Sequence, residues 1–204
     1  MSEHPESMQV IFEKYKEKYV YILKCLYPSK DSTGFPERNL SVNFSKAVEE
    51  FYPSACTWFE FQFGEKNNLH FDAVIIIPEI KSIYIIESKR FSNPTKKIEE
   101  IKKDMVRVNS VSTKYRGELA ARIHNFSEHA AFGVILADVW TETKVKTKIK
   151  NAYLNCNFID LFIPALNNAP FNNESYFVIG FEEATEYDWV NQNYYLLSMM
   201  WQVI

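Results

Sequence analysis

The chain has 204 residues, of which 47% are hydrophobic and 16% aromatic, a composition typical of a packed globular protein rather than a disordered one. Its formal net charge is −3, and its three cysteines have no metal-binding spacing, which argues against a disulfide scaffold or a structural zinc site. With a polar start and no long apolar run, we expect a cytoplasmic protein without a signal peptide or membrane span, folded as a single domain over residues 1–204.

The first forty residues predict a helix and a loop. Apolar and aromatic side chains recur at helical spacing within residues 8–27, and Pro28 ends that helix. Residues 28–39 contain the Pro, Gly and Ser typical of a loop. A second helix is predicted at 41–51, where Phe44, Val48 and their neighbours form one apolar stripe.

Three strands follow the second helix. Residues 56–63 alternate in polarity, and residues 69–77 and 82–91 are rich in β-branched side chains. The last two strands are apolar on both faces, as expected for strands covered on both sides. The short segment between them, PEIK, predicts a hairpin turn.

The remaining elements are predicted as a helix from Pro94 to about residue 110, strands at 130–139 and 176–181, and a last helix. A capping box formed by Thr185 and Asp188 predicts where this last helix begins. Its expected apolar side is formed by Val190, Tyr194, Leu197, Trp201 and Ile204.

This order divides the chain into a helix and loop at 1–40, a core at 41–139 and an extension with a strand and a helix at 140–204. The core reads α-β-β-β-α-β, which predicts an α/β domain layered around a mixed sheet. The aromatic helices at the two ends are expected to pack on the core or on a second subunit, as in a homodimer.

Three charged residues interrupt the apolar strands: Asp72, Glu87 and Lys89. If PEIK forms the turn, the residue numbers of paired positions sum to 159, which places Asp72 opposite Glu87. Cross-strand neighbours have Cβ atoms about 5 Å apart, and residues two apart share a face. We therefore expect two carboxylates and an ammonium close together.

Two carboxylates on an apolar sheet are unfavourable unless a cation neutralises them. Oxygen ligands of this kind suit Mg²⁺, with Mn²⁺ as a substitute, and both ions share their ligand shell with substrate phosphate. Lys89 could orient or deprotonate a metal-bound water, or offset charge in the transition state. The structural alternative is an ion pair of two acids flanking one lysine.

These residues resemble the PD-(D/E)XK nuclease superfamily, which has the restriction-endonuclease-like fold. The resemblance covers residues 41–139 and rests on FDAVII followed by IIESK on two adjacent strands in the order given above. It implies a three-layer core, metal ligation by Asp72 and Glu87, and Lys89 as the catalytic lysine. Phe71 stands where the motif's name has proline.

Many members of this superfamily add a glutamate from the first core helix, and Glu49 and Glu50 are the candidates. At 100° per residue, Glu49 lies about 150° from the centre of the apolar stripe, whereas Glu50 lies about 110° away. Glu50 is therefore the better candidate for a metal ligand, and Glu49 is the alternative.

Two basic segments could contact nucleic acid. On the helix after Pro94, Lys96, Lys103, Arg107 and Lys114 lie on the side opposite the apolar stripe and could follow phosphates. Acidic neighbours at Glu99, Glu100 and Asp104 equally fit a solvated helix face. The four lysines of 144–150 fit an edge strand as well as they fit DNA binding.

The sequence therefore predicts a Mg²⁺-dependent nuclease that cuts DNA by metal-activated water. The alternative is a catalytically inactive domain of the same fold that binds nucleic acid or a protein partner. A third option is an interaction protein that uses the acidic, aromatic residues 151–204.

Overall fold

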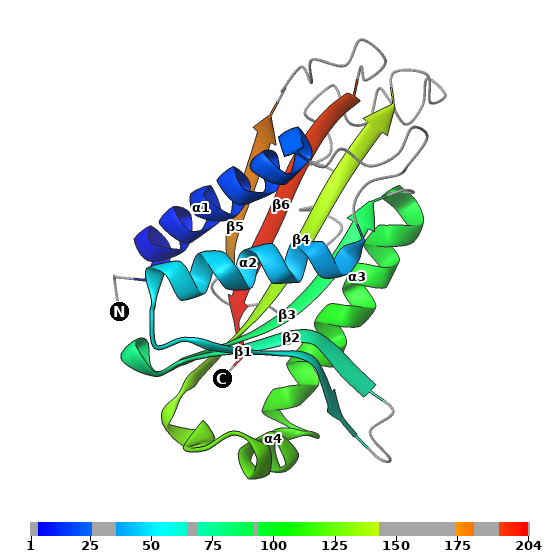
Figure 1. Ribbon diagram of the computed structural model, residues 1–204. Helices are drawn as coiled ribbons and strands as arrows, with labels where there is room; N and C mark the ends of the chain where they lie inside the picture. Colours follow the sequence, from blue (N-terminus) through cyan, green and yellow to red (C-terminus); the bar gives the residue numbers. More distant parts are fainter. Residues whose placement is uncertain are drawn as a thin grey trace.

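The computed structural model describes residues 4–25, 36–64, 69–91, 94–142, 174–181 and 192–203 as an α/β fold with a mixed sheet between two layers of helices (Figure 1). The principal elements are α1 (His4–Cys25), α2 (Glu37–Phe51), β1 (Cys56–Phe63), β2 (Leu69–Ile77), β3 (Ser82–Phe91), α3 (Pro94–Asn109), α4 (Arg116–Arg122), β4 (Ala130–Glu142), β5 (Glu174–Phe181) and β6 (Gln192–Gln202). None of the described helices combines the length and the apolar character that a membrane crossing requires.

Among the described residues, six strands form one sheet in the order β1-β2-β3-β4-β6-β5. The β3–β4 pair is parallel, and the other pairs are antiparallel. Between α2 and β4, the principal elements follow the predicted order α-β-β-β-α-β, and the short helix α4 is added before β4.

The predicted register of the central hairpin is confirmed. A 3₁₀ turn at Pro78–Ile80, with Lys81 in the left-handed conformation, joins β2 to β3. Val74 pairs with Ile85 and Ala73 with Ile86, so the residue numbers sum to 159 as expected.

The predicted C-terminal helix is wrong over the described residues, because Gln192–Gln202 form strand β6. This strand lies inside the sheet between β4 and β5. Both of its faces are buried: Leu196 and Met200 pack on the α1/α2 side, and Met199 and Trp201 on the other. A strand that is apolar on both faces has apolar residues at every spacing, so a helical stripe can be read from it by coincidence. Thr185, Asp188 and residues 144–150 lie outside the described residues.

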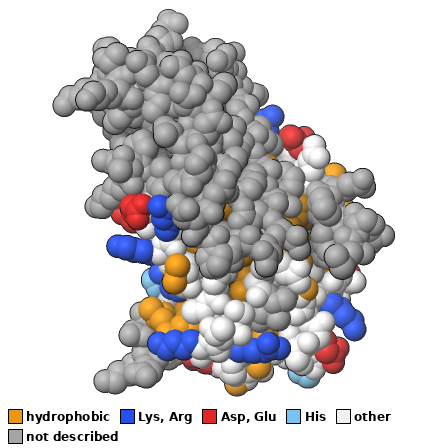
Figure 2. All heavy atoms as spheres, turned by 180° about the vertical axis from the view of Figure 1, so that it is seen from behind, with side chains coloured by type: hydrophobic (Ala, Val, Ile, Leu, Met, Phe, Trp, Pro, Cys, Tyr) orange, Lys and Arg blue, Asp and Glu red, His pale blue; other side chains and the backbone are white. Residues whose placement is uncertain are grey.

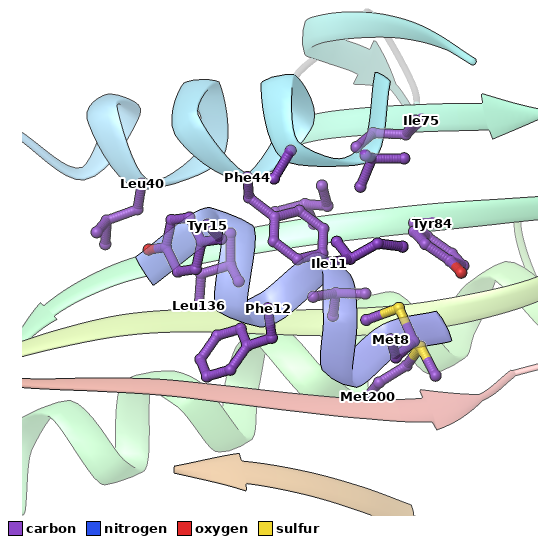
Figure 3. Close-up of a cluster of buried hydrophobic side chains, with 14 of the residues drawn as sticks. Met8, Ile11, Phe12, Tyr15, Leu40, Phe44, Ile75, Tyr84, Leu136 and Met200 are labelled. Atoms are coloured by element: carbon purple, nitrogen blue, oxygen red, sulfur yellow. The ribbon is translucent and has the colours of Figure 1, made fainter. Parts of the chain in front are cut away.

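Two hydrophobic clusters hold the layers together. The first joins α1 and α2 to one face of the sheet, where Phe12, Tyr15 and Phe44 lie in contact (Figure 3). The second joins α3 and α4 to the opposite face and contains Trp201. The indole Nε1–H of Trp201 donates to Asn109 Oδ1 at 2.8 Å, which ties β6 to the end of α3.

We predict that Gly133→Ala is strongly destabilising. Gly133 of β4 pairs with Trp201 of β6, and a Cβ at this position would overlap the Trp201 ring. We expect a loss of about 1–3 kcal/mol in the free energy of unfolding, measured by denaturant titration. The control is Gly117→Ala in α4, where nothing lies within 4 Å of the new methyl group, and which should be neutral or stabilising by up to about 1 kcal/mol. Equal effects of the two substitutions would contradict the position of β6.

Candidate functional site

The sheet forks between β2 and β3. Their ladder runs from Ile77↔Ser82 to Ala73↔Ile86 and goes no further. Beyond it, β2 stays paired with β1, while β3 stays paired with β4 to its end. Figure 1 shows the β1–β2 ribbon and β3 pointing in different directions past this position. We call the place where the strands part, at Asp72 and Glu87, the fork.

The β1–β2 ribbon turns over at the fork. The pair Phe59–Ala73 faces the α1/α2 cluster, whereas Phe61–Phe71 belongs to the α3/α4 cluster. Pairs two residues apart normally share a face, so the alternation breaks at the position between them. Glu60 lies at this break with a φ of 52°, a left-handed conformation that is uncommon for residues other than glycine. The local twist separates β2 from β3 and leaves the Asp72 carboxylate between them.

Asp72 is held by the backbone of β3. The Ser88 N–H donates to Asp72 Oδ2 at 2.6 Å, so a side chain replaces the ladder bond that the fork interrupts. Burial raises the pKa of Asp72, and the Ser88 N–H and the Lys89 charge only partly oppose this effect.

Glu87 and Lys89 face helix α3, where four side chains of alternating charge form an ion-pair network. Glu87 Oε1 accepts from Nε of Arg107 at 3.1 Å and also from Nη2. The same Nη2 lies 2.8 Å from Asp104 Oδ1, and Asp104 Oδ2 lies 2.9 Å from the Lys89 ammonium. The network therefore runs Glu87, Arg107, Asp104, Lys89.

The glutamate that the helix α2 contributes to this region is Glu37. Its Oε1 accepts from the Arg90 N–H at 2.9 Å, and its charge raises the pKa of both Asp72 and Lys89. Glu37 lies in the first turn of α2, which begins four residues earlier than the sequence pattern predicts.

The structure does not bring Glu50 to the fork. Its carboxylate is exposed and lies 2.9 Å from Lys18 and 3.9 Å from Lys14, both on α1. It also lies near the opposite end of α2 from Glu37, roughly 20 Å along the helix axis. Glu49 accepts a hydrogen bond from Thr57 of β1 at 2.6 Å.

The four predicted phosphate-binding residues do not share one helix face. Lys103 is exposed on α3, but Arg107 turns inward to the acids. Lys114 lies beyond Asn109, where α3 ends, so the helical spacing does not extend to it. The side chain of Lys96 lies outside the described ones.

Burial and neighbouring charges act in opposite directions on the pKa values of Glu87 and Lys89. Burial raises the pKa of Glu87 to about 8, although the Arg107 charge opposes the shift. Burial lowers the pKa of Lys89, but the neighbouring acids, Asp104 first, outweigh it and leave a net increase. With all groups ionised, the four acids Glu37, Asp72, Glu87 and Asp104 exceed Lys89 and Arg107 by two negative charges.

The carboxylates at the fork suit a magnesium ion that keeps several of its water ligands better than a metal bound by protein side chains alone. No group of three or more His, Cys, Asp or Glu side chains among the described residues is arranged to hold a metal. Mg²⁺, however, is usually held by one or two carboxylates, with water and phosphate completing its shell. Asp72 and Glu87 supply two such carboxylates at the fork, in a region where acidic side chains outnumber basic ones.

The sequence patterns did not predict that Glu37 and Asp104 would lie near Asp72, Glu87 and Lys89. Asp104 did carry a signal, because it follows Ile101 by three residues and precedes Val108 by four, on the buried side of α3. An acid at such a position needs a buried partner, and Lys89 and Arg107 are those partners. Glu37 carried no comparable signal in a segment that reads as a loop.

Comparisons of the chain with protein-family models, with curated proteins and with solved structures find no match.

We predict that Glu87→Gln changes how stability depends on pH. Because the folded pKa of about 8 exceeds the ordinary value of 4.5, the folded wild type holds an extra proton between these values. Its free energy of unfolding should therefore fall as pH rises from about 5 to 8, by a few kcal/mol from this group alone. Urea titrations in EDTA should show that Glu87→Gln removes this slope, while Glu79→Gln, at an exposed position, keeps it. A wild-type slope retained in Glu87→Gln would contradict the assignment.

Proposed function

We propose that this protein is a metal-dependent nuclease of the PD-(D/E)XK type with a restriction-endonuclease-like core, which hydrolyses phosphodiester bonds in DNA. The observation that carries the proposal is the proximity of Asp72, Glu87 and Lys89 at the fork, where acidic side chains outnumber basic ones. Asp72 and Glu87 would hold Mg²⁺, or Mn²⁺ as a substitute, and Glu37, rather than Glu50, adds negative charge near them.

The metal would supply a polarised phosphate and a water of lowered pKa. The contacts of Lys89 favour one of the roles considered for it from the sequence. Its ammonium is held 2.9 Å from Asp104, and its pKa is raised, so it keeps its proton at neutral pH. A protonated lysine donates hydrogen bonds and offsets negative charge, but it cannot accept a proton from water. Lys89 therefore acts on the charge of the transition state and orients the oxygen atoms around it.

Exposed cations of the layer that contains α3 and α4 support an anionic substrate. Exposed Lys103, Lys114 and Arg116 come from α3, the segment after it and α4, the layer that also supplies Asp104 and Arg107. Figure 2 shows the molecule from behind, with Lys and Arg side chains interspersed with apolar ones on the described surface. Such separated cations can contact phosphates without reading the bases.

A second candidate function is a catalytically inactive module of the same fold that binds nucleic acid or a protein partner. The observation that favours it is the ion-pair network itself, because Arg107 already compensates Glu87 without a metal. Such a module should bind DNA with no cleavage and show no Mn²⁺-dependent increase in melting temperature.

We predict that the purified protein cuts DNA with Mg²⁺ or Mn²⁺ and that EDTA abolishes cleavage. Asp72→Asn and Lys89→Met should each lower the cleavage rate roughly a hundredfold or more, because the first removes a proposed metal ligand and the second removes a positive charge that stabilises the reacting phosphate. Glu37→Gln should lower it as well, whereas Glu50→Gln, whose carboxylate pairs with α1, should not. Gel assays on supercoiled and linear DNA measure these rates, and circular dichroism checks folding. Wild-type protein that binds DNA but cuts neither DNA nor RNA would favour the inactive module.

A further inference from the structure

Arg107 is a cation already bound to the acids of the fork. Its Nε and Nη2 both contact one oxygen of Glu87, and Nη2 also contacts Asp104. The Glu87 side chain is 2% exposed, whereas the Arg107 side chain is 29% exposed. The guanidinium therefore lies between a buried carboxylate and the solvent.

A metal ion and Arg107 compete for the same carboxylate. Arg107 contacts Glu87 through Oε1, so a divalent cation bound to either oxygen would lie on the same carboxylate as the guanidinium. Two cations on one buried carboxylate repel each other at low dielectric. Occupation of Glu87 by a metal therefore favours movement of Arg107 away from it.

The surroundings permit this movement. Arg107 lies in the last turn of α3, with nearly a third of its side chain in solvent. Asp104, one helical turn earlier, contacts Arg107 through one oxygen and Lys89 through the other. Arg107 can thus leave Glu87 and remain paired with Asp104, so no charge is left alone.

We propose that Arg107 is an exchangeable partner of Glu87: it pairs with Glu87 in the metal-free protein, is displaced from it by the divalent cation, and thereby sets the metal affinity of the fork. This inference rests on the proposed function, since it takes Glu87 as a metal ligand. It assigns to Arg107 a role in the site in place of the phosphate contact that the sequence suggested.

The test is the affinity for Mn²⁺ alone, measured by isothermal titration calorimetry on the full chain. Arg107→Gln should bind Mn²⁺ about tenfold more tightly than wild type, because the competing cation is gone. Arg107→Lys keeps the positive charge but lacks the two nitrogen donors of the guanidinium. Its Mn²⁺ affinity should therefore lie between those of wild type and Arg107→Gln. Lys46→Gln removes one positive charge from an exposed position on α2, and its Mn²⁺ affinity should stay within about twofold of that of wild type.

Each outcome decides the inference. If wild type binds Mn²⁺ and Arg107→Gln binds it equally or more weakly, Arg107 is not a competitor, and the proposed metal site stands without it. If neither wild type nor Arg107→Gln binds Mn²⁺, the metal site and the inference both fail. If Arg107→Gln does not fold in EDTA, as judged by thermal unfolding, Arg107→Lys carries the same test with a smaller expected gain.

Discussion

A carboxylate inside a protein needs a compensating charge or a proton, and Glu87 imposes this requirement on its surroundings. Its side chain is 2% exposed, and the cost of burying its charge is the largest influence on its pKa. Helix α3 meets the requirement by placing Arg107 against it, and Asp104 then links Arg107 to Lys89. The orientation of α3 across the end of β3 is thus fixed by electrostatics as well as by apolar packing.

The fork explains why the acids can be buried together at all. In a continuous sheet, β2 and β3 would bond to each other at Asp72 and Glu87, and the two carboxylates would face each other with no donor between them. The twist at Glu60 turns the β1–β2 ribbon away, so the Ser88 N–H becomes available to Asp72. A strained backbone conformation of order 1–2 kcal/mol therefore creates the space in which the site lies. Strain of this kind is concentrated at functional sites in many proteins.

The sequence predicted the parts of this arrangement that depend on local patterns. A short turn between two apolar strands determines their register, so counting residues predicted the pairs from Ile77↔Ser82 to Ala73↔Ile86. The expected pair of Asp72 with Glu87 lies one step beyond the end of this ladder, where the strands part. The glutamate of α2 could not be predicted in this way. The pattern located the apolar stripe of the helix but not its first turn, and the charged residue near the fork lies in that turn.

Other errors have the same origin in long-range packing. Asp104 has lysines at helical spacing and so resembles a solvated residue, yet α3 packs with this side against β3. The end of the chain is apolar at both helical and strand spacing, and only the neighbouring strands β4 and β5 determine that it forms β6. Tertiary contacts of this kind override local preferences.

The central claim is that the fork holds a divalent cation between Asp72 and Glu87, and a crystal soaked in Mn²⁺ tests it most directly. Anomalous diffraction should show one manganese ion within coordination distance of both carboxylates, with the Arg107 guanidinium no longer on Glu87. A fork without an anomalous peak, with Arg107 still bound to Glu87 at saturating Mn²⁺, would contradict the claim and leave the network as a structural ion pair.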